Sequence, residues 1–157
     1  MANQTQRPDT ALHNTSHLMQ YHDLIESIVA AMDARDAYTA KHSDRVADMV
    51  LVLATALDLS EDEATLLHMA AHLHDIGKIA VPDSVLRKAG PLTNPEWEEM
   101  RRHPVTGYEI LRKVDDFKEI AVLVRHHHER WDGRGYPDGL KGDDIPISAQ
   151  VVALADV

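Results

Sequence analysis

The string His74-Asp75-Ile76-Gly77-Lys78 holds the residues of this chain that are best suited to chemistry. It places an imidazole beside a carboxylate, with a cation three residues after the carboxylate. This mixture suits a site that holds divalent metal ions against a phosphate group. A single His-Asp pair is a weak signal, and its weight comes from further candidate ligands downstream. These are His103, His126, His127, His128, Glu129, Asp132 and Asp156.

The chain has 11 histidines, and they differ in what they indicate. His68 and His72 are four residues apart on a predicted helix, so they share a face and could chelate one ion. No acidic residue lies between them as in a zinc-protease helix, and ligation is the less favoured interpretation. His72 also points about 160° away from His74, so the two hardly serve one site. Solvated or partly buried imidazoles are expected near the N-terminus, at His13, His17 and His22.

Composition narrows the kind of site. With 157 residues, 44% of them hydrophobic, the chain has the size and composition of one soluble globular domain. Cysteine is absent, so a metal would be bound by nitrogen and oxygen, and disulfides, zinc fingers and iron-sulfur clusters are excluded. The net charge of -10 argues against binding to duplex nucleic acid. An anionic substrate would need local positive charge, which bound metal ions can supply.

Nothing in the sequence predicts contact with a membrane. The longest apolar run, residues 49–57, is too short to span a bilayer, and the N-terminus lacks the pattern of a signal peptide. A cytoplasmic location is therefore expected.

Helical periodicity accounts for nearly all of the chain after a polar tail at residues 1–15, which is expected to be disordered. Residues 16–157 are expected to form one domain. Ser60 and Glu63 have the spacing of a capping box, and Gly77 is expected to end the helix that they begin. Asn94 is the predicted N-cap of a helix that ends near His103. Two further helices are predicted at about residues 18–32 and 39–57. Three more are predicted to begin at Pro104, at Asp115 or Asp116, and at Ser148. Residues 133–146 are predicted to form a loop. Strand pairs and repeats are not evident, so the predicted class is all-α.

These motifs resemble the HD-GYP domain, a subgroup of the HD phosphohydrolases. The resemblance covers about residues 36–157 and is highly specific. The matching residues are His74 to Lys78, His127-His128-Glu129, Asp132-Gly133 and Gly135-Tyr136-Pro137, with Tyr38-Thr39 before His42-Ser43, Arg45-Val46, and Leu92-Thr93 before His103-Pro104.

The resemblance implies an HD-domain helical bundle with a Gly/Pro-rich GYP loop, and a bacterial signalling enzyme that hydrolyses cyclic di-GMP. It implies two or sometimes three divalent ions, usually iron or manganese, with zinc, nickel or cobalt as further options. Some members have a carboxylate at the position of Tyr38, so its absence here favours two ions. The implied ligands are His42, His74, Asp75, His103, His127, His128 and Asp156. Asp75 would bridge the ions, and Lys78 would lie by the substrate phosphate.

The implied chemistry is physically consistent. Two metals about 3.5 to 4 Å apart can share a hydroxide and clamp the phosphoryl oxygens during in-line attack. Lys78 would stabilise developing charge and supply a proton to the leaving 3'-oxygen. The product would be linear pGpG, with further cleavage to GMP left open.

Several alternatives stay open. The loop residues Gly133, Gly135, Tyr136 and Pro137 form either a rigid turn or a surface for substrate access and for GGDEF-domain partners. Family domains continue past the position of Asp156 into further helices, so a chain that stops at Val157 is expected to lack these helices, which would weaken Asp156 as a ligand. A catalytically impaired module that binds cyclic dinucleotides, and a phosphodiesterase acting on cyclic GMP-AMP, are the competing functions. The oligomeric state is open, with a homodimer as one option.

Overall fold

The structure is a computed structural model that describes residues 15–35 and 41–157. The predicted tail, apart from Thr15, and Tyr38 lie outside these residues. Every regular element in the described part is helical, which confirms the all-α prediction. None of the described helices is long and apolar enough to cross a membrane. The α-helices are α1 (His22–Arg35), α2 (His42–Ala56), α3 (Glu61–Leu73), α4 (Asp83–Leu86), α5 (Asn94–Met100), α6 (His103–Leu111), α7 (Lys118–His126) and α8 (Ile147–Ala155). The 3-10 helices are η1 (Thr15–Tyr21), η2 (Ile76–Ala80), η3 (Asp115–Phe117) and η4 (Gly142–Asp144).

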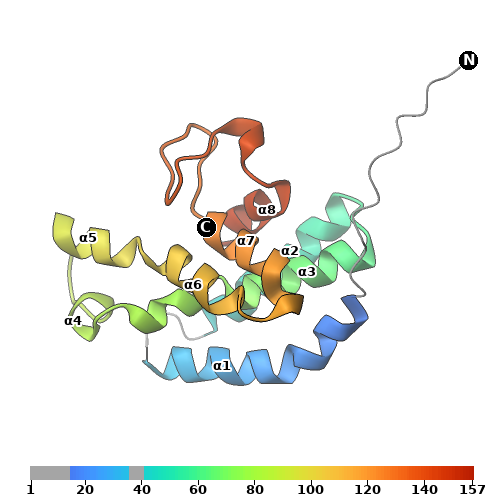
Figure 1. Ribbon diagram of the computed structural model, residues 1–157, viewed down its shortest axis with the longest axis horizontal. Helices are drawn as coiled ribbons and strands as arrows, with labels where there is room; N and C mark the ends of the chain where they lie inside the picture. Colours follow the sequence, from blue (N-terminus) through green and yellow to red (C-terminus); the bar gives the residue numbers. More distant parts are fainter. Residues whose placement is uncertain (1–14, 36–40) are drawn as a thin grey trace, which may run out of the picture.

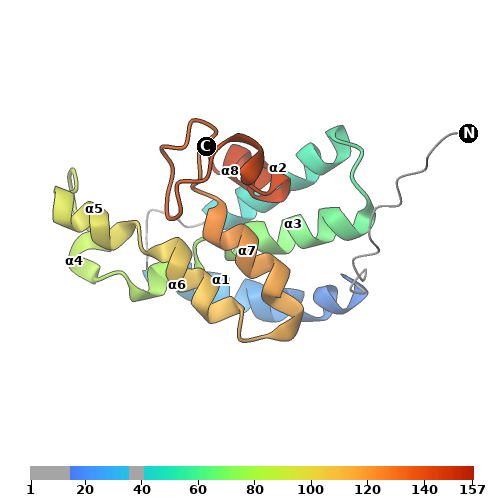
Figure 2. The ribbon, with the colours of Figure 1, turned by 45° about the horizontal axis from the view of Figure 1, so that its top comes forward.

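The core lies where α2, α3, α7 and α8 pack together. α2 and α3 form a helical hairpin, α7 packs on α3 and α6, and α8 packs on α2 and α7. α1 lies along the other side of α3, while α4 and α5 extend from one end of the bundle (Figures 1 and 2). The loop between α7 and α8 lies over the C-terminal end of α7 (Figure 1). Aliphatic side chains fill the core, as expected for a chain with 4% aromatic residues; they include Ile25, Val46, Val50, Leu67, Leu73, Ile120, Val124 and Val152.

The capping prediction for α3 is confirmed, and the one for α5 is shifted by one residue. Ser60 and Glu63 form the predicted capping box. The N-cap of α5 is Thr93 rather than Asn94, because the Glu96 carboxylate accepts hydrogen bonds from the Thr93 amide and hydroxyl at 2.7 and 2.8 Å. The first residues of three other helices also differ slightly from the predicted ones. α1 begins after the 3-10 helix η1, and α7 begins after η3. α8 begins one residue before Ser148.

Gly77 has a different role from the predicted one. α3 ends at Leu73, and Gly77 lies inside η2, which packs against the start of α6. A Cβ at Gly77 would lie 1.9 Å from the His103 carbonyl oxygen and 2.6 Å from the Gly107 nitrogen. The glycine is therefore needed for close approach of two backbones, and not for ending a helix.

Candidate metal centre

The ends of five helices bring the predicted ligands together. His42 is the first residue of α2, and His74 and Asp75 directly follow α3. His127 and His128 follow α7, and Asp156 follows α8. Three helix C-termini therefore face one region, where the negative ends of their dipoles favour cations. His103 was predicted near a helix end, but it begins α6, because α5 stops three residues earlier, at Met100.

These side chains form two triplets that are connected by Asp75. One triplet is His42, His74 and Asp75, and the other is His103, His127 and His128; within each, the possible ligand atoms lie within 4.8 Å of one another. The Asp75 Oδ2 atom lies 3.3 Å from His74 Nε2, and its Oδ1 atom lies 3.4 Å from His103 Nε2. The two oxygens of one carboxylate thus face different triplets.

Asp156 joins the first triplet despite its place after the last helix. Its Oδ1 atom lies 2.8 Å from His42 Nε2 and 3.3 Å from His74 Nε2. Its side chain is 16% exposed. Two histidines therefore contact the carboxylate, although it directly follows the last helix.

Three of the histidines are oriented in the same way. Nδ1 of His74, His103 and His127 donates a hydrogen bond to the carbonyl oxygen three residues earlier, at 2.6, 2.8 and 2.6 Å respectively. Because a carbonyl oxygen only accepts, Nδ1 carries a proton in each ring, and Nε2 is the nitrogen that can offer a lone pair to the centre when the ring is neutral. Such hydrogen bonds fix the tautomer of metal-binding histidines.

The arrangement of these nitrogens fits divalent metal ions. Nε2 of His74 is buried and has no hydrogen-bond partner among the described residues. Nε2 of His103 and Nε2 of His127 lie 3.4 Å apart, with the Nδ1 protons directed away from the gap. Ligand atoms bound at about 2.0–2.1 Å to one tetrahedral ion are separated by roughly 3.3 Å. The facing lone pairs therefore have the separation that a shared cation requires.

Burial and charge divide the histidines into two groups. Burial opposes a charge on His74, but the carboxylates of Asp75 and Asp156 outweigh it and raise the pKa of His74 to about 10. Burial lowers the pKa of His103, lowers that of His127 further, and lowers that of His128 to about 4. The second triplet is therefore neutral and ready to bind a cation, whereas His74 holds a proton that an ion must displace.

Lys78 lies on the first turn after the His-Asp pair and contacts it. Its Nζ donates to Asp75 Oδ2 at 2.6 Å, and its side chain is half-buried. Arg35, at the end of α1, holds this turn: its guanidinium donates to the carbonyl oxygens of Lys78, Ile79 and Val81 at 3.0, 2.7 and 2.6 Å. Arg35 could not be recognised in the sequence, because an arginine at a helix end is also common without such a role.

The GYP loop is fixed to α7 by a buried carboxylate. Glu129 accepts hydrogen bonds from the backbone amides of Asp138 and Gly139 at 2.7 and 3.0 Å. The Tyr136 ring stacks on His128 with centroids 4.8 Å apart, and its bond to Pro137 is cis. Sequence analysis noted Glu129 in the motif without assigning it this role.

Two loop glycines are needed for different reasons. Gly133 has a φ of 75°, in the left-handed region that favours glycine. Gly135 is needed for another reason, since a Cβ there would lie 2.4 Å from the Arg130 nitrogen and 2.6 Å from the His128 carbonyl oxygen. His126 turns away from the centre to Asp138, at 3.0 Å, so the three adjacent histidines do not face one way.

Comparison with known proteins shows the family to which the chain belongs. A family model described as HD domain matches residues 22–157. The chain is 45% identical over 137 residues to the cyclic di-GMP phosphodiesterase response regulator RpfG of Xanthomonas campestris pv. campestris, covering 86% of this chain and 36% of that protein. It is also 45% identical over 140 residues to 3'3'-cGAMP-specific phosphodiesterase 2 of Vibrio cholerae, covering 86% of this chain and 26% of that protein.

The fold is also found in a solved structure. The HDG"Y"P protein Bd1817 of Bdellovibrio bacteriovorus superposes with a TM-score of 0.64 at 21% identity, over 92% of this chain and 55% of that one. This likeness concerns the fold alone. The chain spans about a third of the length of the curated relatives that it matches.

Proposed function

The chain belongs to the HD domain family and, by its motifs, to the HD-GYP subgroup, and on that premise we propose that it is a metal-dependent phosphodiesterase that hydrolyses cyclic di-GMP to pGpG. The observation that carries the proposal is the pair of triplets connected through the two oxygens of Asp75. A relative with 45% identity is named as a cyclic di-GMP phosphodiesterase, which supports the choice of substrate.

The proposed ligands of one ion are His42, His74, Asp75 and Asp156, and those of the other are His103, His127, His128 and Asp75. Imidazole and carboxylate donors without thiolate suit iron and manganese, and also zinc, nickel and cobalt. When bound, the ions would supply Lewis acidity toward a phosphate group and activate a water molecule as nucleophile.

The remaining groups of the site are suited to hold a phosphodiester. The Lys78 ammonium lies beside the candidate ligands, where it can neutralise a phosphate oxygen or hold a proton for the leaving 3'-oxygen. Tyr136 lies against His128, so the GYP loop forms one wall of the centre. We propose that this loop also takes part in contacts with GGDEF-domain partners, together with the exposed Trp131 that precedes it.

A second candidate substrate is 3'3'-cGAMP, because a relative that is equally similar in identity is named as specific for it. Both substrates are cyclic dinucleotides cleaved at the same kind of phosphodiester bond. A third possibility is a module that binds the nucleotide without cleaving it.

One experiment separates these functions. The iron- or manganese-loaded protein, purified without oxygen, is incubated in parallel with cyclic di-GMP and 3'3'-cGAMP, and linear products and nucleotide binding are both measured. We expect pGpG from cyclic di-GMP, with GMP appearing later if pGpG is also a substrate. Faster cleavage of 3'3'-cGAMP would favour the second candidate. Binding without any linear product would contradict the proposal and favour the binding module.

A matched pair of variants connects activity to the centre. Asp75→Asn removes the carboxylate that faces both triplets, and we expect it to lower metal content from two equivalents to less than one and to abolish turnover. Asp116→Asn changes an exposed carboxylate that accepts a hydrogen bond from Tyr21, outside both triplets, and serves as the control. Unchanged metal content in Asp75→Asn would contradict the assignment of ligands.

A further inference from the structure

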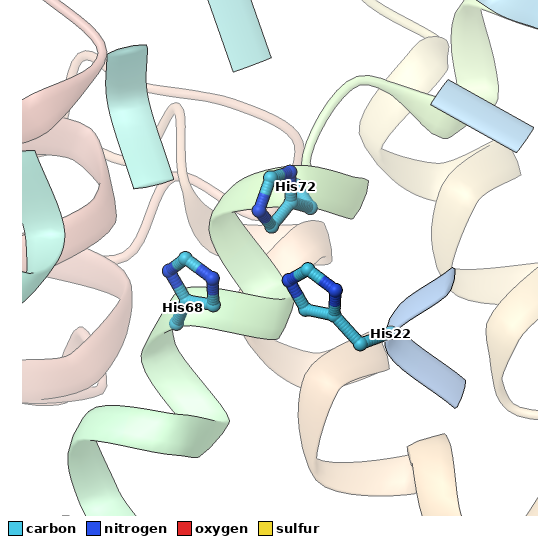
Figure 3. Close-up of side chains that lie close together, drawn as sticks. All are labelled: His22, His68 and His72. Atoms are coloured by element: carbon cyan, nitrogen blue, oxygen red, sulfur yellow. The ribbon is translucent and has the colours of Figure 1, made fainter. Parts of the chain in front are cut away.

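A third group of histidines lies outside the centre. His22, the first residue of α1, lies against His68 and His72 on α3. Figure 3 shows the three rings turned toward a common space between these helices. One ring nitrogen of each lies within 4.8 Å of the others. The 3.6-residue helical period brings His68 and His72 to one face, and packing of α1 against α3 supplies His22.

The packing of the rings is close and their surroundings are polar. The His22 and His68 rings are parallel, with centroids 5.7 Å apart, and His72 meets each of them edge-on, at 5.6 and 4.7 Å. His72 is 6% exposed, and its Nδ1 has no hydrogen-bond partner among the described residues. A buried polar nitrogen without a partner is costly, and a bound cation would remove that cost.

The charges around the group favour a cation. Glu26 Oε1 lies 3.6 Å from His22 Nδ1, and Asp44 Oδ1 lies 3.8 Å from His72 Nδ1. Burial lowers the pKa of His68, so this ring is neutral and can donate its lone pair. The rings thus provide nitrogen donors, and the carboxylates provide negative charge at the edge of the group.

We propose that His22, His68 and His72 form a second metal site, for a divalent ion of the zinc type, which ties the start of α1 to α3. Three imidazole donors and one carboxylate are a common ligand set for zinc, and Glu26, one turn after His22, is the nearest carboxylate for the fourth position. Nitrogens around one zinc ion are roughly 3.3 Å apart, so each pair of ring nitrogens, now within 4.8 Å, needs to close by no more than about 1.5 Å.

The site is distinct from the candidate centre in both ligands and role. His72 lies on α3 two residues before His74, yet the two rings serve different groups, as the helical angle between them predicts. A closed site with four protein ligands leaves no position for substrate, so the ion at this site would have a structural role. Its effect is to fix α1, whose last residue, Arg35, holds the turn with Lys78.

The test uses zinc in a chain whose first centre has been removed by Asp75→Asn and His127→Ala. After loading and desalting, metal is counted by mass spectrometry, and folding is checked by circular dichroism. We expect this background to retain one zinc equivalent and to lose it on addition of His68→Gln. His126→Gln, which removes a histidine bound to Asp138, is the control and keeps the equivalent.

Affinity and thermal stability give independent readouts. We expect His22→Gln to weaken zinc binding in the background chain by more than 10-fold, since loss of an outer-shell partner alone typically costs about 10–100-fold. Zinc at 100 times its dissociation constant should raise the Tm of the background chain by roughly 5–10 °C, and that of the His68→Gln form by much less.

Two results would overturn the proposal: a folded background chain that retains no zinc, or a His68→Gln form that keeps its equivalent. If the background chain does not fold, the same comparison is made in the otherwise unchanged chain. There His68→Gln should lower total zinc by one equivalent, and His126→Gln should not. An unchanged total would again contradict the site.

Discussion

Replacing Gly77 by alanine should force His103 away from Asp75 and empty the candidate centre, although neither residue is itself changed. The new Cβ would lie 1.9 Å from the His103 carbonyl oxygen, whereas real Cβ contacts are essentially never under 3.0 Å. η2 and the start of α6 must therefore separate by about 1 Å, because a close-packed interior offers no free space. Metal ligands tolerate deviations of only about 0.2 Å.

The same overlap sets the loss of stability. Overpacking typically costs about 1–3 kcal/mol, and the upper end applies here because the nearest atoms, in the His103 carbonyl group and the Gly107 amide, belong to the backbone and no rotamer change can move them. For a chain of this size, about 3 kcal/mol corresponds to a fall in Tm of roughly 6–12 °C. We expect this fall together with the loss of at least one metal equivalent.

Gly107→Ala is the matched control at the same contact between η2 and α6. Its Cβ would lie 2.7 Å from Val124 Cγ1, a side-chain atom rather than a backbone atom, so we expect a smaller loss, of about 1–2 kcal/mol, and wild-type metal content. Tm is measured by circular dichroism and metal by mass spectrometry on the folded fraction from gel filtration. A Gly77→Ala chain that binds two equivalents and melts with the wild type would refute the reasoning.

Three further predictions follow from the site. Despite burial, the adjacent carboxylates hold the pKa of His74 at about 10, so a metal ion competes with the proton on this ring. The apparent metal affinity, measured by competition with a chelator, should therefore rise about tenfold per pH unit from pH 6 to 8. An affinity that does not change with pH would contradict this. Glu129→Ala removes the oxygen that accepts both bonds; it should cost about 1.5–3 kcal/mol and speed hydrogen exchange of the two loop amides, and unchanged exchange would count against it. Arg35→Lys keeps the positive charge but loses the planar set of donors that binds the backbone of the turn with Lys78. Because Lys78 would then be less well positioned, turnover should fall while metal content stays unchanged.

The sequence predicts which side chains gather at the centre, because their types and their places near helix ends can be recognised along the chain. His74 and Asp75 were expected near the end of a helix, and they directly follow α3. The absence of cysteine limits the metal-binding atoms to nitrogen and oxygen, and the helical periodicity predicts the all-α class. These inferences need only local information along the chain.

The positions that the sequence did not predict all depend on contacts between distant segments. Gly77 was interpreted as a helix end, because its contact with the His103 backbone is visible only once α6 packs on η2. Arg35 gives no signal until α1 lies beside the turn that follows α3. The same holds for His22, which was expected to be solvated or partly buried and lies in a group with two histidines more than 40 residues away.

The charge of the centre explains how an acidic chain could bind an anionic dinucleotide. Without ions, the carboxylates of Asp75 and Asp156 are balanced by Lys78 and by the proton on His74, so the site has little net charge to offer a phosphate. Two divalent ions would displace that proton, and two carboxylates cannot neutralise them. The loaded centre would then be strongly positive within a chain of net charge -10. Substrate affinity should therefore depend on metal loading much more than on surface charge, because the attraction arises at the ions and Lys78.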